Sequence, residues 1–322
     1  MKNMLQQNEL GTTGIKVTEY CLGVLPMGPL QSGLPEKNCL EIIEKAIDLG
    51  VNFFDTAESY KTQPYMGQFM NRNRSNLVVS TKSHAKTYDD MGAAVEKSLQ
   101  ELQTGYIDIY HLHSARDGLE VFEERKGALK KLNDLKQEQV IRAVGIATHN
   151  VKVVDKAAER DDVDILFVLV NKIGMGLVGG TTAEMVAAIE KAANAGKGLY
   201  VMKALAGGNL LSEYDDALSW ARRLKGISSV SVGVVSIEEL LQNLKFFGVK
   251  TPETENVSSE ITIKEKKLFI LDRLCTACGS CVEACPNEAL YLEDDKAKVN
   301  HENCILCGYC SPECPEFLIR LT

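Results

Sequence analysis

The chain has 322 residues, of which 45% are hydrophobic and 25% charged, and its formal net charge is -8. This length and apolar content suffice for one large and one small domain with a sizeable core. The acidic balance argues against nucleic acid as a partner, and no apolar run approaches the roughly 18 residues of a membrane span. We therefore expect small molecules or other proteins as partners. The first residues, MKNMLQQNELG, lack the apolar centre of a signal peptide, so a cytoplasmic location is expected.

Short apolar runs alternate with helical segments through the first 250 residues. Paired threonines and a glycine at 10–17 predict a hairpin, and the Gly- and Pro-rich stretch 23–38 predicts a loop on the rim of a site. The predicted strands are residues 18–22, 51–55, 77–82, 107–113, 142–147, 165–170, 199–203 and 230–232. The predicted helices include 36–49, 89–102, 119–137, a helix opened by a Thr181–Glu184 capping box, 214–223 and 236–246.

Eight such strand–helix units in about 250 residues predict an α/β fold, a closed (β/α)8 barrel of the TIM type. An open, doubly wound sheet is the alternative. No GxGxxG sequence follows the first predicted strand to support that alternative.

Ionisable side chains end three consecutive predicted strands. Asp55 closes the run VNFFD, Lys82 closes LVVSTK and His113 closes IDIYHLH. Tyr60 lies in the loop after the first of these strands. Because reacting groups in a barrel come from the carboxyl ends of strands and the loops that follow, we expect the four side chains to meet at the barrel mouth. A plain Asp–Lys salt bridge beside a bystander tyrosine is the alternative.

Several of these segments together resemble the aldo/keto reductases. The similar runs are NFFDTAESY, STKS, DIYHLHS and VIRAVGIATHN, and the similarity extends over residues 10–247. The resemblance implies an eight-stranded barrel with catalytic positions at Asp55, Tyr60, Lys82 and His113. In such a site Tyr60 protonates a carbonyl oxygen, Lys82 held by Asp55 acidifies the phenol, and His113 orients the substrate. The hydride must come from a cofactor, since no side chain supplies one.

Three further histidines are expected near the same mouth. His111 shares a strand face with His113, and we expect it to be a hydrogen-bonded core residue. His84 and His149 follow strand ends and would also lie at the mouth. A metal site there is conceivable, although carboxylate partners at ligand spacing are missing.

The resemblance also implies which residues hold NAD(P)H. They are Ala147, Thr148, Lys172, Met202, Ser236, Glu239 and Asn243. Ala147, Thr148 and Lys172 depart from the Ser, Asn and Gln that are frequent in the family. Met202 stands where an aromatic ring commonly stacks on the nicotinamide. Ser236 and Glu239 predict a capping box, and the basic residues that favour a 2′-phosphate are absent. A flavin is the alternative organic cofactor.

Eight of the ten cysteines lie between residues 275 and 314, in two copies of C-x-x-C-x-x-C-x-x-x-C-P that are 29 residues apart. This crowding indicates metal ligands and not disulfides, whereas Cys21 and Cys39 are expected to be buried thiols without chemistry. Zinc is the competing interpretation, because paired CxxC motifs also bind zinc.

The cysteine pattern resembles the bacterial ferredoxins with two [4Fe-4S] clusters, over residues 265–322. The resemblance implies that the fourth cysteine of each motif serves the other cluster. One cluster would take Cys275, Cys278, Cys281 and Cys314, and the other Cys304, Cys307, Cys310 and Cys285.

These observations predict a barrel at 1–250, a linker at 251–264 and a ferredoxin-type domain at 265–322. The leading hypothesis is a cytoplasmic oxidoreductase that reduces a small carbonyl or oxidises an alcohol with NAD(P)H. Its clusters would link it to a one-electron donor or acceptor protein, or serve structure. The rival hypothesis is a ferredoxin-dependent enzyme that uses flavin or another acceptor and not NAD(P)H. A third reading, an electron carrier with an inactive barrel, is disfavoured by the four matching residues.

Overall fold

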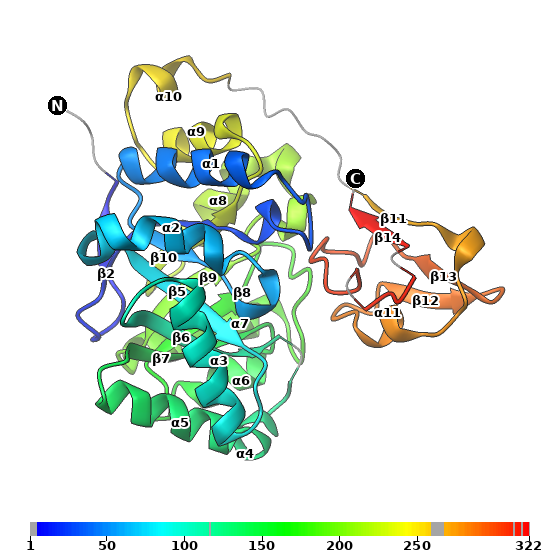
Figure 1. Cartoon of the computed structure of the whole chain (residues 1–322), viewed down its shortest axis with the longest axis horizontal. Helices are drawn as coiled ribbons and strands as arrows, with labels where there is room; N and C mark the ends of the chain where they lie inside the picture. Colours follow the sequence, from blue (N-terminus) through cyan, green and yellow to red (C-terminus); the bar gives the residue numbers. More distant parts are fainter. Residues whose placement is uncertain (1–4, 116, 259–266, 312, 317, 322) are drawn as a thin grey trace.

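The computed structural model describes residues 5–115, 117–258, 267–311, 313–316 and 318–321. Figure 1 shows a barrel wrapped in helices, with a smaller group of strands beside it. In the described part of the chain, no helix has both the length and the apolar character that crossing a membrane requires.

Eight parallel strands close into a barrel in the order β10-β3-β4-β5-β6-β7-β8-β9. They are β3 (Tyr20–Gly23), β4 (Phe53–Asp55), β5 (Val78–Ser83), β6 (Ile107–Ser114), β7 (Ile141–Thr148), β8 (Ile165–Leu169), β9 (Gly198–Met202) and β10 (Ile227–Gly233). The last strand, β10, pairs with the first, β3, and with β9, so the sheet has no free edge. The predicted (β/α)8 barrel is therefore confirmed, and the open sheet is wrong.

Helices surround the barrel (Figure 1). They are α1 (Glu36–Asp48), α2 (Gln63–Asn73), α3 (Tyr88–Glu101), α4 (Val121–Glu124), α5 (Lys126–Gln137), α6 (Val151–Ala157), α7 (Thr182–Asn194), α8 (Tyr214–Arg222), α9 (Ile237–Phe246) and α10 (Pro252–Asn256). The single helix predicted over 119–137 is wrong, because the chain breaks at Arg125 between α4 and α5. The Arg125 guanidinium donates to the backbone carbonyls of Ser83, Ala85 and His113. These tertiary hydrogen bonds hold Arg125 out of helical geometry.

The predicted helix caps differ in how fully they form. Thr181 and Glu184 make the complete capping box that opens α7. Ser236 caps α9 by accepting from the Glu239 backbone N–H. The Glu239 carboxylate, however, accepts from the backbone N–H of Val235. Only half of the capping box predicted there is present.

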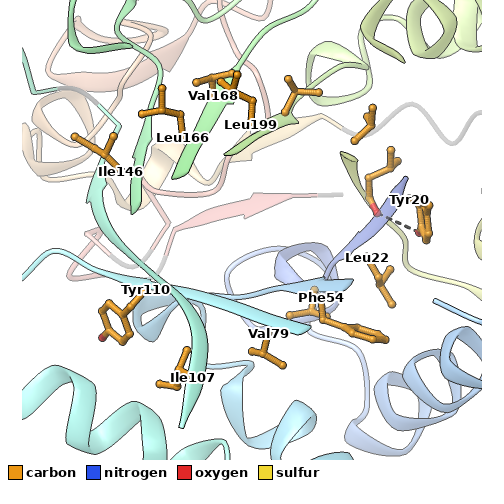
Figure 2. Packing of buried hydrophobic residues seen from close by; sticks show 14 of the residues in the cluster. Tyr20, Leu22, Phe54, Val79, Ile107, Tyr110, Ile146, Leu166, Val168 and Leu199 are labelled. Carbon is orange, nitrogen blue, oxygen red and sulfur yellow. Dashed lines mark hydrogen bonds between the residues drawn. The ribbon is translucent and has the colours of Figure 1, made fainter. Parts of the chain in front are cut away.

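Apolar side chains pack on both faces of the barrel sheet. Leu22, Phe54 and Val79 point outward and pack beneath the helices (Figure 2). Their strand neighbours Cys21 and Phe53 point inward and fill the barrel. Because alternate residues of a strand face opposite sides, the residue two positions after Phe53 also faces the interior. That residue is Asp55.

An antiparallel hairpin joins the barrel at its amino-terminal end. Its strands are β1 (Gln7–Glu9) and β2 (Lys16–Thr18), which flank the predicted turn. Gly11 in the turn has φ +55°, and a Cβ there would lie 2.4 Å from the carbonyl oxygen of Gly196. Only glycine fits this close approach. Leu10, Ile15 and Val17 complete the packing of the barrel interior.

The remaining strands form two small antiparallel sheets. β11 (Leu268–Ile270) pairs with β14 (Ile319–Leu321), and β12 (Leu290–Glu293) pairs with β13 (Lys296–Val299). A short helix, α11 (Ser280–Glu283), packs beside them (Figure 1). Within the predicted linker, 252–256 forms α10, and 259–264 lies outside the described residues.

Candidate active site

Three adjacent barrel strands carry the predicted catalytic residues. Asp55 ends β4, Lys82 lies one residue before the end of β5, and His113 one residue before the end of β6. Because β5 pairs with both β4 and β6, these side chains leave the sheet from neighbouring positions. Tyr60 ends the short 3-10 helix Glu58–Tyr60 that follows β4. All four side chains are buried at this end of the barrel.

A buried ion pair lies at the base of the site. Lys82 Nζ is 2.7 Å from Asp55 Oδ2 and donates to the Thr56 carbonyl oxygen at 2.7 Å. The hydroxyls of Ser80 and Tyr200 donate to Asp55 Oδ1 at 3.1 and 3.3 Å. Burial raises the pKa of Asp55 and lowers that of Lys82, and each charge opposes the effect of burial on its partner. The two supporting hydroxyls face inward by strand alternation, which is the signal that could have identified them.

The Tyr60 phenol lies beside this pair. Lys82 Nζ is 4.8 Å from the centroid of the Tyr60 ring. Burial, followed by the neighbouring phenol of Tyr309, raises the pKa of Tyr60 well above its ordinary value. Burial is the largest effect on the pKa of this phenol in the covered site, and the expectation that Lys82 acidifies it stays a prediction. The phenol is therefore protonated at neutral pH.

His113 faces Tyr60 across the site. The two rings meet edge to face with centroids 5.9 Å apart, and the His84 ring stacks on His113 at 4.0 Å. Burial, then the charges of His84 and Lys82, hold the pKa of His113 well below its ordinary value. The imidazole is therefore neutral, with one ring nitrogen that can donate a hydrogen bond and one that can accept.

Tyr309 enters the site from the cysteine-rich part of the chain. Its hydroxyl lies 3.0 Å from His113 Nε2 and is also a hydrogen-bond partner of the Tyr60 phenol. Sequence reasoning missed this residue. It lies between Cys307 and Cys310, and no sequence pattern indicates that this loop reaches the barrel mouth.

Two other histidines at this end of the barrel, His111 and His149, are also buried. His111 is buried and its Nε2 lies 2.8 Å from the Tyr200 hydroxyl, which agrees with the predicted core role. Burial lowers the pKa of His149 to about 3. Within the described ranges, no three or more His, Cys, Asp or Glu side chains converge as a single metal ion needs. The histidine metal site at the barrel mouth therefore gains no support.

The first three residues predicted to hold NAD(P)H differ in burial and in their hydrogen-bond partners. Ala147 is buried, and the Thr148 hydroxyl accepts from the Asn150 backbone N–H. The Lys172 ammonium pairs with two carboxylates, those of Glu213 and Asp216. Each polar group named here already has a partner within the protein.

The side chains at the other predicted NAD(P)H positions also contact groups of the protein. The Asn243 amide oxygen accepts from the Tyr214 hydroxyl, and Ser236 and Glu239 cap α9. Met202 packs against Ile305 and other residues of the cysteine-rich part. The binding of NAD(P)H by these residues stays a prediction.

The eight clustered cysteines line two separate pockets. One is lined by Cys275, Cys278, Cys281 and Cys314, and the other by Cys285, Cys304, Cys307 and Cys310. These are the two sets that the sequence resemblance implies. Backbone N–H groups point at several of the sulfurs, including Ala289 N to Cys285 Sγ at 3.2 Å and Ala297 N to Cys275 Sγ at 3.4 Å. Four thiols around a pocket with N–H donors fit an iron–sulfur cluster.

Comparisons with known proteins agree with this arrangement. The family model described as "Aldo/keto reductase family" matches residues 21–217, and that described as "4Fe-4S dicluster domain" matches residues 267–315. The uncharacterized oxidoreductase YqkF of Bacillus subtilis (strain 168) is 29% identical over 176 residues, 49% of this chain and 54% of that protein. L-galactose dehydrogenase of Arabidopsis thaliana is 31% identical over 156 residues, 44% of this chain and 48% of that protein. The chain thus spans about half the length of these curated relatives.

Solved structures resemble the barrel. PA4992 from Pseudomonas aeruginosa superposes with a TM-score of 0.66 at 25% identity, covering 75% of this chain and 94% of that one. The holo form of aldo-keto reductase AKR11C1 from Bacillus halodurans, at 19% identity and a TM-score of 0.63, shows the shared fold alone; it covers 81% of this chain and 99% of that one. From the family match and the barrel together, the chain belongs to the aldo/keto reductase family of oxidoreductases and carries a 4Fe-4S domain at its carboxyl-terminal end.

Proposed function

We propose that the barrel mouth interconverts a small carbonyl compound and its alcohol, with Tyr60 moving the proton. One observation carries this proposal: the Tyr309 hydroxyl is bound by His113 and Tyr60 next to the buried Lys82–Asp55 pair. A hydroxyl is the product of carbonyl reduction. The groups that hold the Tyr309 oxygen can therefore hold the oxygen of a substrate.

The four residues have distinct roles in this reaction. The neutral His113 donates from Nε2–H to the carbonyl oxygen and orients it. Tyr60 gives its hydroxyl proton to that oxygen as negative charge develops there. The Lys82 ammonium, close to the Tyr60 ring, stabilises the tyrosinate that is left. Asp55 keeps the ammonium oriented. In alcohol oxidation the same proton returns to Tyr60.

The hydride source that the family expectation implies is NAD(P)H. Of the predicted cofactor residues, Lys172 and Asn243 have their polar groups bound inside the protein, and Met202 is covered. The hydride that carbonyl reduction needs is therefore supported by the family expectation alone.

A second candidate function draws its electrons from the cysteine-rich domain and does not use NAD(P)H. The observation that favours it is a cluster of Leu169, Ile305 and Cys307, against which Met202 of the barrel packs. Cys307, one of the second set of cysteines, is also close enough to Tyr60 for its charge to act on that phenol. Carbonyl reduction takes two electrons and two protons: two [4Fe-4S] clusters would supply one electron each, Tyr60 the proton on oxygen, and water the proton on carbon. A flavin is the alternative two-electron carrier.

The partner of the cysteine-rich domain would be a one-electron carrier protein. The support is the surface around the first set of cysteines, where Cys278 is exposed. Large apolar side chains are exposed on the same domain: Phe269, Leu271, Leu274, Tyr291 and Leu292. Of these, Leu292 lines the pocket of the first set of cysteines, and apolar surface beside an exposed ligand suits a docking carrier. We place the protein in the cytoplasm, where thiols stay reduced, because none of its ten cysteines forms a disulfide.

An anaerobic assay of the cluster-loaded protein tests the proposal. A panel of small aldehydes, ketones and alcohols is offered with NADH, NADPH, or a reduced viologen dye as the electron donor. Turnover with a nicotinamide supports the family expectation, and turnover with viologen alone supports the second candidate. Absence of turnover with every donor and substrate would refute the carbonyl assignment.

A further inference from the structure

The catalytic groups are closed off from solvent. The exposed fractions are 4% for Asp55, 5% for Tyr60, 1% for Lys82 and 3% for His113. A substrate cannot reach groups that are this deeply covered. Whatever covers them must move before turnover.

The cover is the loop 304–310, which carries three of the second set of cysteines. The Gln31 amide donates to the Leu306 carbonyl at 3.1 Å, and the Asn209 amide donates to the Cys304 carbonyl at 3.4 Å. At Gly207, which has φ +69°, a Cβ would lie 2.0 Å from the Ile305 carbonyl oxygen. The backbone of this loop therefore packs directly against the rim of the barrel.

Tyr309 is the side chain that this loop inserts into the site. Its ring meets the His113 ring edge to face with centroids 6.0 Å apart, and its hydroxyl lies 3.0 Å from His113 Nε2. The same hydroxyl interacts with the Tyr60 phenol. Tyr309 therefore bonds to the two groups that must bind the oxygen of a substrate.

We propose that Tyr309 is an internal occupant of the substrate-oxygen site, which a substrate must displace to bind. This inference rests on the proposed function for its assignment of that oxygen site. Loop docking and substrate binding exclude each other, because one pair of groups serves both oxygens. The observed affinity of a substrate is therefore lowered by the share of molecules in which Tyr309 is docked. Tyr309 thus competes with the substrate: only a substrate whose oxygen binds both His113 and Tyr60 can displace it.

Binding of 4-methylphenol, the free equivalent of a tyrosine side chain, tests the proposal without any turnover. Calorimetry compares the cluster-loaded wild type with the Tyr309→Ala variant, which leaves the site vacant. The variant should bind 4-methylphenol at least about tenfold more tightly than the wild type does. Toluene lacks the hydroxyl and should bind the variant about threefold to tenfold more weakly than 4-methylphenol, as one or two lost hydrogen bonds imply. Equal binding of 4-methylphenol by the two proteins would overturn the proposal.

A milder substitution tests the proposal even if the Tyr309→Ala variant does not fold. Tyr309→Phe keeps the ring and removes the hydroxyl, and Tyr291→Phe, at an exposed tyrosine of the same domain, is its matched control. Hydrogen exchange of the backbone in 304–310 should rise in Tyr309→Phe and stay unchanged in Tyr291→Phe. Unchanged exchange in both variants would refute the docking role.

Kinetics separates this inference from the proposed function. With a carbonyl that turns over, Tyr309→Phe should lower KM about threefold to tenfold, the effect of one or two hydrogen bonds, without lowering kcat. A lower kcat at unchanged KM would make Tyr309 part of the catalytic machinery and overturn the proposal. If no carbonyl turns over, the proposed function fails, while the 4-methylphenol and exchange measurements still decide whether Tyr309 occupies the site.

Discussion

Removing the Lys82 ammonium should destabilise the barrel strongly. The Nζ–Oδ2 distance to Asp55 is 2.7 Å, and the side chains of both residues are almost fully buried. Coulomb's law gives about 6 kcal/mol at an effective dielectric constant of about 20. Breaking one partner of a buried pair costs about 3–5 kcal/mol after desolvation is included. We therefore expect Lys82→Met to lower the free energy of unfolding by about 3–5 kcal/mol.

Urea denaturation followed by the fluorescence of Trp220, the only tryptophan, measures this change. With a slope of about 3 kcal/mol per molar, the midpoint should fall by about 1–2 M. Adding Asp55→Asn to Lys82→Met should recover most of the loss, since no buried charge then stays unpaired. Lys130→Met, which removes an exposed pair with Asp134, should leave the midpoint near that of the wild type. A wild-type midpoint for Lys82→Met, or a double variant that loses the sum of both single losses, would refute the reasoning.

Three further outcomes are expected. Because burial raises the pKa of the Tyr60 phenol in the covered site, an ultraviolet difference titration of the wild type against Tyr60→Phe should show no Tyr60 tyrosinate up to about pH 10; tyrosinate near neutral pH would contradict this. Cys307→Ser should lower the analysed iron from about eight to about four atoms per chain, whereas Cys39→Ser should leave it unchanged; full iron in Cys307→Ser would remove that ligand. Leu274→Glu should slow reduction by a ferredoxin about tenfold, while Leu119→Glu on the barrel should not. Equal rates with the two glutamate variants would remove the proposed docking patch.

The barrel and its catalytic end were predictable because strand residues alternate between two faces. Phe53 faces the interior, so Asp55 does too, and the same period aligns Lys82 with Ser80. Apolar runs buried on both faces identified each barrel strand within three residues at either end. Closure could be predicted because eight repeated units leave few other topologies.

The features that the sequence did not predict depend on contacts between distant parts of the chain. Arg125 lies in a run with helical periodicity, yet its guanidinium binds carbonyls of two other segments and breaks the helix. Tyr309 and His113 are 196 residues apart, and nothing near Tyr309 in the sequence signals that contact. The raised pKa of Tyr60 follows from the same cover, which excludes water from its phenol. Local patterns cannot predict how one domain closes another.

The rate of carbonyl reduction by Tyr60→Phe tests the central claim most directly. It is measured anaerobically on cluster-loaded protein with whichever donor supports turnover, alongside Tyr65→Phe, a partly buried tyrosine in α2. The account predicts that Tyr60→Phe loses about 10²–10⁴-fold in rate, the contribution of a positioned proton donor, while Tyr65→Phe stays near the wild type. A Tyr60→Phe variant that reduces the carbonyl at the wild-type rate would contradict it.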